Sequence, residues 1–128
     1  MTKSLRILDY LEHILKAIER IHRYTANMDE VAFLRNELVQ DAVIRNIEII
    51  GEASNNIQRG AAEFAEQHGN IPWQVMYTMR NRVSHGYAKV DLEIVWRTIQ
   101  SDLTSLHAQI SEVRTTLLHN GNHDDMKP

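Results

Sequence analysis

The residues best suited to chemistry lie together between Arg80 and Lys89. This segment, RNRVSHGYAK, contains two arginines, an asparagine, a histidine, a tyrosine and a lysine but no acidic residue, although the whole chain carries a formal net charge of −3. Arginine presents a planar guanidinium that can contact two phosphate oxygens at once. Histidine has an unperturbed pKa near neutrality, so it can take or give a proton there. The segment therefore holds the residue types needed to bind a phosphate group and to move a proton beside it.

Arg80, His85 and Tyr87 around one phosphate would suit the cleavage of RNA without a metal ion. In that reaction the 2′-hydroxyl attacks the adjacent phosphorus, His85 takes or donates a proton, and Arg80 stabilises charge on the non-bridging oxygens. On one continuous helix Arg80 and His85 would point about 140° apart. They can share a ligand only if the helix ends between them, and Gly86 favours such an ending.

This reaction needs both a base and an acid, whereas the segment supplies one histidine per chain. A two-fold dimer that brings two copies together would supply both, and would widen the basic patch into a groove. A simpler explanation stands beside this one. Arg80 and Arg82 near a helix C-terminus interact favourably with the helix dipole, and that alone can account for them. The segment by itself leaves both interpretations open.

Amphipathic helices are expected to position this segment. The predicted helices cover residues 4–25, 30–35, 37–59 and 91–119, where apolar residues recur at helical spacing, and residues 61–68 are expected to form a helical turn. Pro72 predicts a further helix that runs to between Val83 and His85 and carries the segment at its C-terminal end. No stretch alternates with period two for long enough to be a strand. The sequence therefore predicts an all-α protein, a bundle of four to five helices.

Several residues at helix ends and on helix faces have expected roles. Asp29 and Asp91 are predicted N-caps, and Gly60 is expected to end the helix 37–59. Asn46 falls within an apolar stripe, where it is either a buried, hydrogen-bonded amide or an amide turned towards a site. His22 falls on an apolar line and is expected to be buried.

The composition sets wider limits. A chain of 128 residues fits one domain, predicted here as residues 1–118 followed by a disordered tail, 119–128. The absence of cysteine excludes disulfides and thiolate metal sites and fits the cytoplasm, and no apolar run is long enough for a membrane span. The one tight cluster of metal-ligating types lies in the predicted tail: His119, His123, Asp124 and Asp125. No metal site and no cofactor is predicted from it.

Several short motifs, taken together, resemble one known family. In order they are Ile49-Ile50-Gly51-Glu52-Ala53, Ile71-Pro72-Trp73, Met79-Arg80-Asn81-Arg82, Arg80-x4-His85-Gly86-Tyr87 and Val95-Trp96. The fourth matches the Arg-x4-His-x-Tyr motif of the HEPN superfamily. Over about residues 5–106 the chain most resembles the HepT toxins of HEPN/MNT toxin–antitoxin pairs.

The resemblance implies a helical bundle that dimerises with its motifs facing one cleft, and a metal-independent ribonuclease acting on mRNA or tRNA. Arg80 and His85 would be the catalytic pair, and Asn81 the polar residue that assists them. Further supporting or RNA-binding residues are expected at Arg82, Glu52 and Lys89, of which Glu52 is either a solvated, paired surface residue or one that orients a basic group of the site.

The resemblance also implies a partner. A small nucleotidyltransferase antitoxin of the MNT type would transfer AMP from ATP to Tyr87. Neutralisation would be by this modification, by formation of a complex that extends to a larger hetero-oligomer, or by both. AMP adds a phosphate charge and bulk where RNA phosphate must sit, so it opposes RNA binding. The alternative function is a non-catalytic helical module that binds a nucleotide or a partner chain, and a third is a purely structural bundle.

Overall fold

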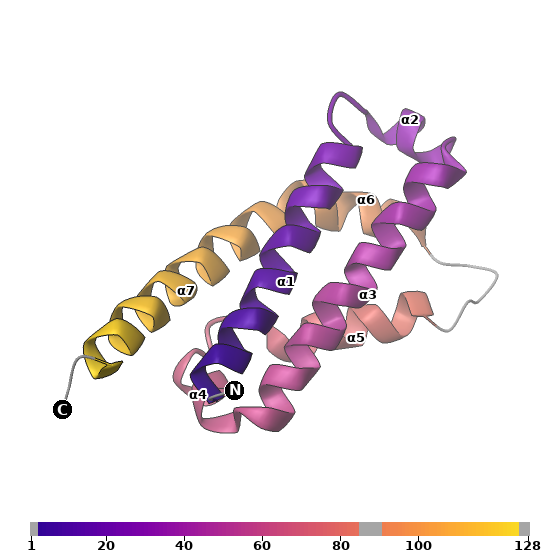
Figure 1. The fold of residues 1–128 in the computed structure, drawn as a ribbon. Helices are drawn as coiled ribbons and strands as arrows, with labels where there is room; N and C mark the ends of the chain where they lie inside the picture. Colours follow the sequence, from indigo (N-terminus) through magenta and orange to yellow (C-terminus); the bar gives the residue numbers. More distant parts are fainter. Residues whose placement is uncertain (1–2, 85–90, 126–128) are drawn as a thin grey trace.

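The computed structural model describes residues 3–84 and 91–125, which form seven helices and no strand (Figure 1). These are α1 (Lys3–Tyr24), α2 (Glu30–Leu34), α3 (Glu37–Gly60), α4 (Ala62–Gln67), α5 (Trp73–Ser84), α6 (Leu92–Ser101) and α7 (Leu103–Asp125). The prediction of an all-α protein is confirmed. The predicted number of four to five helices is wrong for this part of the chain. The expected last helix is divided in two, and the expected turn 61–68 contains a helix of its own, α4.

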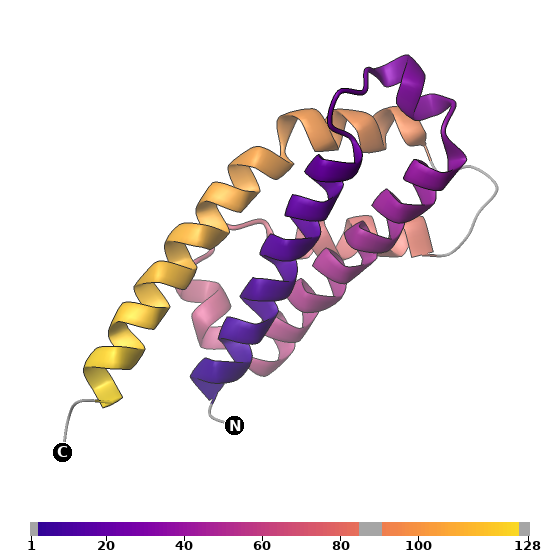
Figure 2. The ribbon, with the colours of Figure 1, turned by 45° about the horizontal axis from the view of Figure 1, so that its top comes forward.

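The long helices pack side by side around an aliphatic core. α1 lies between α3 and α7, and α5 crosses α3 on its other side (Figures 1 and 2). Fully buried side chains come from α1, α3 and α7, among them Ile14 and Ile18 of α1, Val43 of α3 and Ile110 of α7. Removal of this apolar surface from water is the main force that holds α3 in place as the support for α5.

The predicted helix 91–119 is broken at Asp102, which ends α6 and donates its N–H to the Thr98 carbonyl oxygen at 2.9 Å. The break lets the two halves pack against different neighbours. α6 contacts α2, where the rings of Phe33 and Trp96 lie 5.3 Å apart, whereas α7 runs along α1. The apolar stripe continues through the break without interruption, so the sequence pattern predicted one helix.

The other end of that helix also differs from expectation. α7 continues to Asp125, so the predicted end near His119 is wrong. The division into a domain 1–118 and a tail 119–128 stays a prediction. Among the helices of the described ranges, none combines the length and apolar character needed to cross a bilayer.

Side-chain caps begin the helices largely as predicted. Asp29 accepts a hydrogen bond from the Ala32 N–H at 2.8 Å, and Asp91 caps α6 in the same way. Gly60 lies inside α3, and Ala61 is the residue that ends it. Ala61 is only 3% exposed and donates its N–H to the Ile57 carbonyl oxygen. The helical hydrogen bonding thus extends past Gly60, and Ala61 packs in the core.

The two polar residues expected in the core behave differently. Asn46 is 5% exposed; its Nδ2 donates to the Ala42 carbonyl oxygen at 2.8 Å, and its Oδ1 accepts from Arg20 of α1 at 3.2 Å. The prediction of a buried, hydrogen-bonded amide is confirmed. His22 is only half-buried, because Ile21 takes the centre of the apolar face of α1 and His22 falls at its edge. The prediction of a buried histidine is wrong.

Candidate functional site

The C-terminal half of α5 carries the described part of the candidate site. Arg80, Asn81 and Arg82 lie in its last two turns, and α5 ends at Ser84. The helix is thus described as far as Ser84, and the predicted end between Val83 and His85 stays a prediction, because the residues after Ser84 lie outside the described ranges. The remaining candidate residues, His85, Tyr87 and Lys89, lie outside the described residues.

Arg80 is held against α3 along the aliphatic part of its side chain. A Cβ atom built on Gly51 would lie 2.1 Å from Arg80 Cβ and 2.9 Å from Arg80 Cγ, so α5 approaches α3 more closely here than any side chain at Gly51 would allow. The Arg80 Nε is buried and has no hydrogen-bond partner among the described residues. Such groups are rare in folded proteins and cost about 1–3 kcal/mol each. This N–H is therefore a donor that a ligand could satisfy.

Asn81 fixes the outer end of the same side chain. Its Oδ1 accepts a hydrogen bond from Arg80 Nη1 at 3.1 Å. Both residues are half-buried, so the guanidinium is restrained at Nη1 and at its stem while part of it remains accessible. The structure thus brings together Arg80 and Asn81, and the assisting role of Asn81 stays a prediction.

Arg82 points to a different side of α5. It is exposed and lines a shallow depression with Gln74, Val75, Thr78 and Met79. Two residues along a helix correspond to a turn of about 200°, which takes Arg82 away from the Gly51 contact. Arg82 can therefore add positive charge near the site but does not share a ligand position with Arg80 on the same helix face.

Glu52 follows Gly51 on α3 and is exposed. It forms no ion pair with Arg80 or Arg82, so the structure does not show it orienting either arginine. A link from Glu52 to His85 or Lys89 stays a prediction, because both partners lie outside the described residues.

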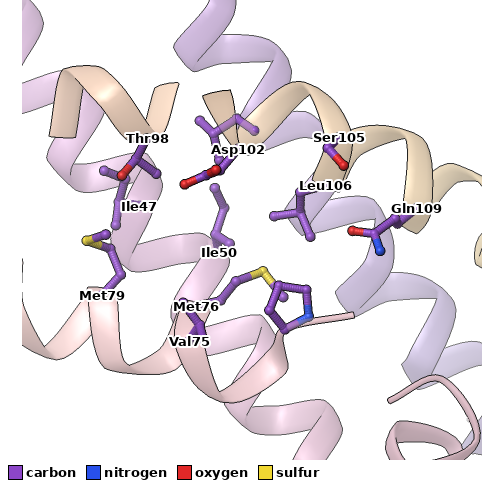
Figure 3. Close-up of a pocket in the computed structure, with 12 residues that line it drawn as sticks. Ile47, Ile50, Val75, Met76, Met79, Thr98, Asp102, Ser105, Leu106 and Gln109 are labelled. Atoms are coloured by element: carbon purple, nitrogen blue, oxygen red, sulfur yellow. The ribbon is translucent and has the colours of Figure 1, made fainter. Parts of the chain in front are cut away.

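An apolar pocket of about 240 Å³ opens on another side of α5 (Figure 3). Ile47 and Ile50 of α3, Met76 and Met79 of α5, and Leu103 and Leu106 of α7 contribute to its walls. Asp102, at the break between α6 and α7, supplies a carboxylate at its rim. Sequence reasoning missed this pocket because its wall depends on that break. Arg80 is not among its lining residues.

Metal-ligating side chains do not cluster in the described part of the chain. His119 of the sequence cluster is exposed, and the other three members have no described side chains. The expectation that this cluster forms no metal site therefore stays a prediction.

Taken together, the described residues form an all-helical bundle with an arginine near the end of α5 that is restrained by Asn81 and whose Nε has no partner among them. The family model described as "Ribonuclease HepT-like" matches residues 14–113, which span α1 to α7 and include the whole Arg80–Lys89 segment. The chain belongs to the HepT-like ribonuclease family, and the predicted resemblance is confirmed.

Individual relatives agree with this assignment. The chain is 42% identical over 106 residues to a protein of Thermococcus cleftensis named "Probable ribonuclease HepT", covering 83% of this chain and 94% of the relative. It is 34% identical over 104 residues to a protein of Caldanaerobacter subterraneus subsp. tengcongensis named as a putative RNase, covering 81% and 90%. A protein of Methanocaldococcus jannaschii named "Gamma-glutamylcyclotransferase and putative RNase" is 39% identical over 123 residues, but the chain spans only 53% of its length. No solved structure matches the chain significantly.

Proposed function

We propose that this protein is a ribonuclease that cleaves RNA without a metal ion, using Arg80, Asn81 and His85. The observation that carries the proposal is the side chain of Arg80, whose buried Nε–H has no partner within residues 3–84 and 91–125 and whose Nη1 is held by Asn81. Membership of the HepT-like family supports RNA as the substrate. A restrained guanidinium with a free donor suits the non-bridging oxygens of a phosphodiester, whose charge grows in the transition state.

The reaction forms a bond between the 2′-oxygen and phosphorus and breaks the bond from phosphorus to the 5′-oxygen. A base takes the proton from the 2′-hydroxyl, and an acid gives a proton to the departing 5′-oxygen. His85 is the residue proposed for both steps, one copy from each chain of a homodimer. A two-fold axis beside α5 would bring two copies of the segment into one cleft and double its positive charge.

The wider role proposed is that of a toxin whose partner is a nucleotidyltransferase antitoxin. That partner would add AMP to the Tyr87 phenol, two residues after His85. The added phosphate would compete with RNA phosphate for Arg80, which explains in physical terms how the modification would neutralise the enzyme. The resemblance to HepT toxins supports this role, and mRNA or tRNA is the proposed target.

A second function is favoured by the apolar pocket. A pocket of about 240 Å³ lined by aliphatic and methionine side chains is a common way to bind a small molecule or a side chain of a partner. In this alternative the protein binds a nucleotide or a partner chain and catalyses nothing itself.

The test is an RNA cleavage assay in EDTA with wild type, His85→Ala, Tyr87→Phe and the control His119→Ala. His119 is exposed on α7, so its substitution makes the same chemical change away from α5. Wild type, Tyr87→Phe and His119→Ala are expected to cleave tRNA or total RNA, and His85→Ala to lose at least about 100-fold in rate, as general acid–base catalysis contributes that much. Circular dichroism checks that all four proteins fold.

The mass of each purified protein is measured first, because AMP on Tyr87 would silence an active enzyme. Unmodified wild type that leaves RNA intact would exclude the ribonuclease and support the binding module. Cleavage that disappears in EDTA and returns with a divalent cation would exclude the metal-independent mechanism but would leave the ribonuclease function in place.

A further inference from the structure

The contact between Gly51 of α3 and Arg80 of α5 is closer than side chains permit. The three atoms nearest to a Cβ built on Gly51 are Arg80 Cβ at 2.1 Å, the Met76 carbonyl oxygen at 2.8 Å and Arg80 Cγ at 2.9 Å. All three belong to the backbone of α5 or to the base of one side chain. None is the far end of a flexible group that could swing aside, so any residue larger than glycine would push α5 away from α3.

Arg80 gains two properties from this approach. Its Cβ and Cγ lie directly on the backbone of α3, which restricts the rotamers that the side chain can adopt. Its Nε is buried in the same seam, so the N–H keeps one direction and is shielded from water. The bond from Nη1 to Asn81 then sets the plane of the guanidinium.

We propose that Gly51 is a positioning residue: its lack of a side chain sets the depth of α5 on α3 and so fixes the Arg80 guanidinium where the phosphate binds. The inference rests on the proposed function for its catalytic consequence, but the positioning itself is a property of the fold. A displacement on the order of 1 Å in a catalytic group can cost about 100-fold in rate. Gly51 would thus govern catalysis without touching substrate.

Gly60 provides a matched control on the same helix. It lies in the last turn of α3, and a Cβ built on it meets nothing within 4 Å. Gly51→Ala and Gly60→Ala therefore make the same chemical change in one helix, one against Arg80 and one in open space. Both replace glycine by a better helix former, so any gain from helix propensity is common to them.

The first measurement compares the kinetics of these two variants with wild type on an RNA that wild type cleaves. Gly51→Ala is expected to lower kcat about 10- to 100-fold and to change KM less than about threefold, because the guanidinium acts mainly on transition-state charge. Gly60→Ala is expected to match wild type. Equal kcat values for Gly51→Ala and wild type would overturn the proposal.

The second measurement reports on Arg80 without using activity. In a ¹H–¹⁵N NMR spectrum, the buried Nε–H of Arg80 is expected to give a signal protected from exchange, assigned by its loss in Arg80→Lys. Gly51→Ala should shift this signal or remove its protection. The Nε–H of Arg114, which is bonded to Glu12 at the α1–α7 contact, serves as the internal reference and should not move. An unchanged Arg80 signal in Gly51→Ala would refute positioning.

The two measurements separate this inference from the proposed function. If wild type cleaves no RNA, the ribonuclease proposal fails while the NMR comparison still decides whether Gly51 positions Arg80. If Gly51→Ala does not fold, the double variant Gly51→Ala/Arg80→Gly is compared with Arg80→Gly, since glycine at 80 removes two of the three closest atoms. The double variant is expected to fold, because glycine at 80 makes room for the added methyl group. A double variant that fails to fold while Arg80→Gly folds would contradict a direct contact between residues 51 and 80.

Discussion

Two helix–helix contacts in this protein each contain an arginine, and the hydrogen bonding of the arginine Nε differs between them. Between α1 and α7, Arg114 donates through its Nε to a Glu12 carboxylate oxygen, and His107 lies 2.9 Å from Glu19 in the same contact. Between α3 and α5, the corresponding Nε of Arg80 is buried and has no hydrogen-bond partner in the described part of the chain. Both arginines are half-buried, but the Nε of Arg114 is paired, whereas the Nε of Arg80 has no partner among the described residues.

The difference indicates what each contact is for. A paired surface arginine contributes at most about 1 kcal/mol to stability and needs no other explanation. A buried donor without a partner lowers stability, and folded proteins usually keep such a group where it serves a purpose. The α1–α7 contact is therefore explained by structure alone, whereas the α3–α5 contact contains a donor that a ligand could satisfy.

The largest effect that this comparison predicts is on catalysis. Arg80→Ala removes the free donor and the charge, and single-turnover cleavage of RNA is expected to fall about 100- to 1000-fold, as for the loss of one preorganised donor to an oxyanion. Arg114→Ala removes an arginine of equal charge and is expected to change the rate less than about threefold, since it lies in a paired contact on other helices.

A similar loss in both variants would mean that arginine charge in general, through RNA binding at a distance, supports cleavage. The salt dependence of the rate separates the cases: a general charge effect should fade as salt rises. A loss in Arg80→Ala that persists at high salt would support a specific contact.

A smaller effect is predicted for Asn81. Asn81→Ala removes the oxygen that accepts from Arg80 Nη1 but leaves the contact of Arg80 with Gly51. The guanidinium should then turn more freely, and the cleavage rate is expected to fall about tenfold, the value of one hydrogen bond to a charged group. Gln74→Ala, an exposed change at the other end of α5, is the control. A rate for Asn81→Ala equal to that of this control would show that Asn81 does not orient Arg80.

Local signals in the sequence account for much of the fold. Asp29 and Asp91 cap their helices as predicted, because a short acidic side chain before an apolar repeat has few other structural uses. The pairing of Arg80 with its neighbour in sequence, Asn81, is likewise a local contact.

What the sequence could not predict depends on contacts between distant segments. Gly51 was recognisable only as part of a motif; that its missing side chain makes room for Arg80 follows from how deeply α5 sits on α3. The break at Asp102 lies in an apolar repeat that continues through it. The break separates α6, which packs on α2, from α7, which packs on α1. The apolar pocket was missed for the same reason, because its walls come from α3, α5 and the two helices that meet at this break.

The smallest predicted effect concerns stability, and it has opposite signs at the two contacts. Arg80→Met keeps the aliphatic stem on Gly51 but removes the unpartnered Nε–H, so the free energy of unfolding is expected to rise by about 1 kcal/mol. Arg114→Met breaks the pair with Glu12 and is expected to lower it by about 0.5 kcal/mol. Urea denaturation of both variants at one pH measures the difference. A protein that gains stability on losing Arg80 while losing cleavage would show that the free donor is kept for function at a cost to the fold. A loss of stability in Arg80→Met would instead mean that the Nε–H is satisfied in solution, and the contrast between the two contacts would disappear.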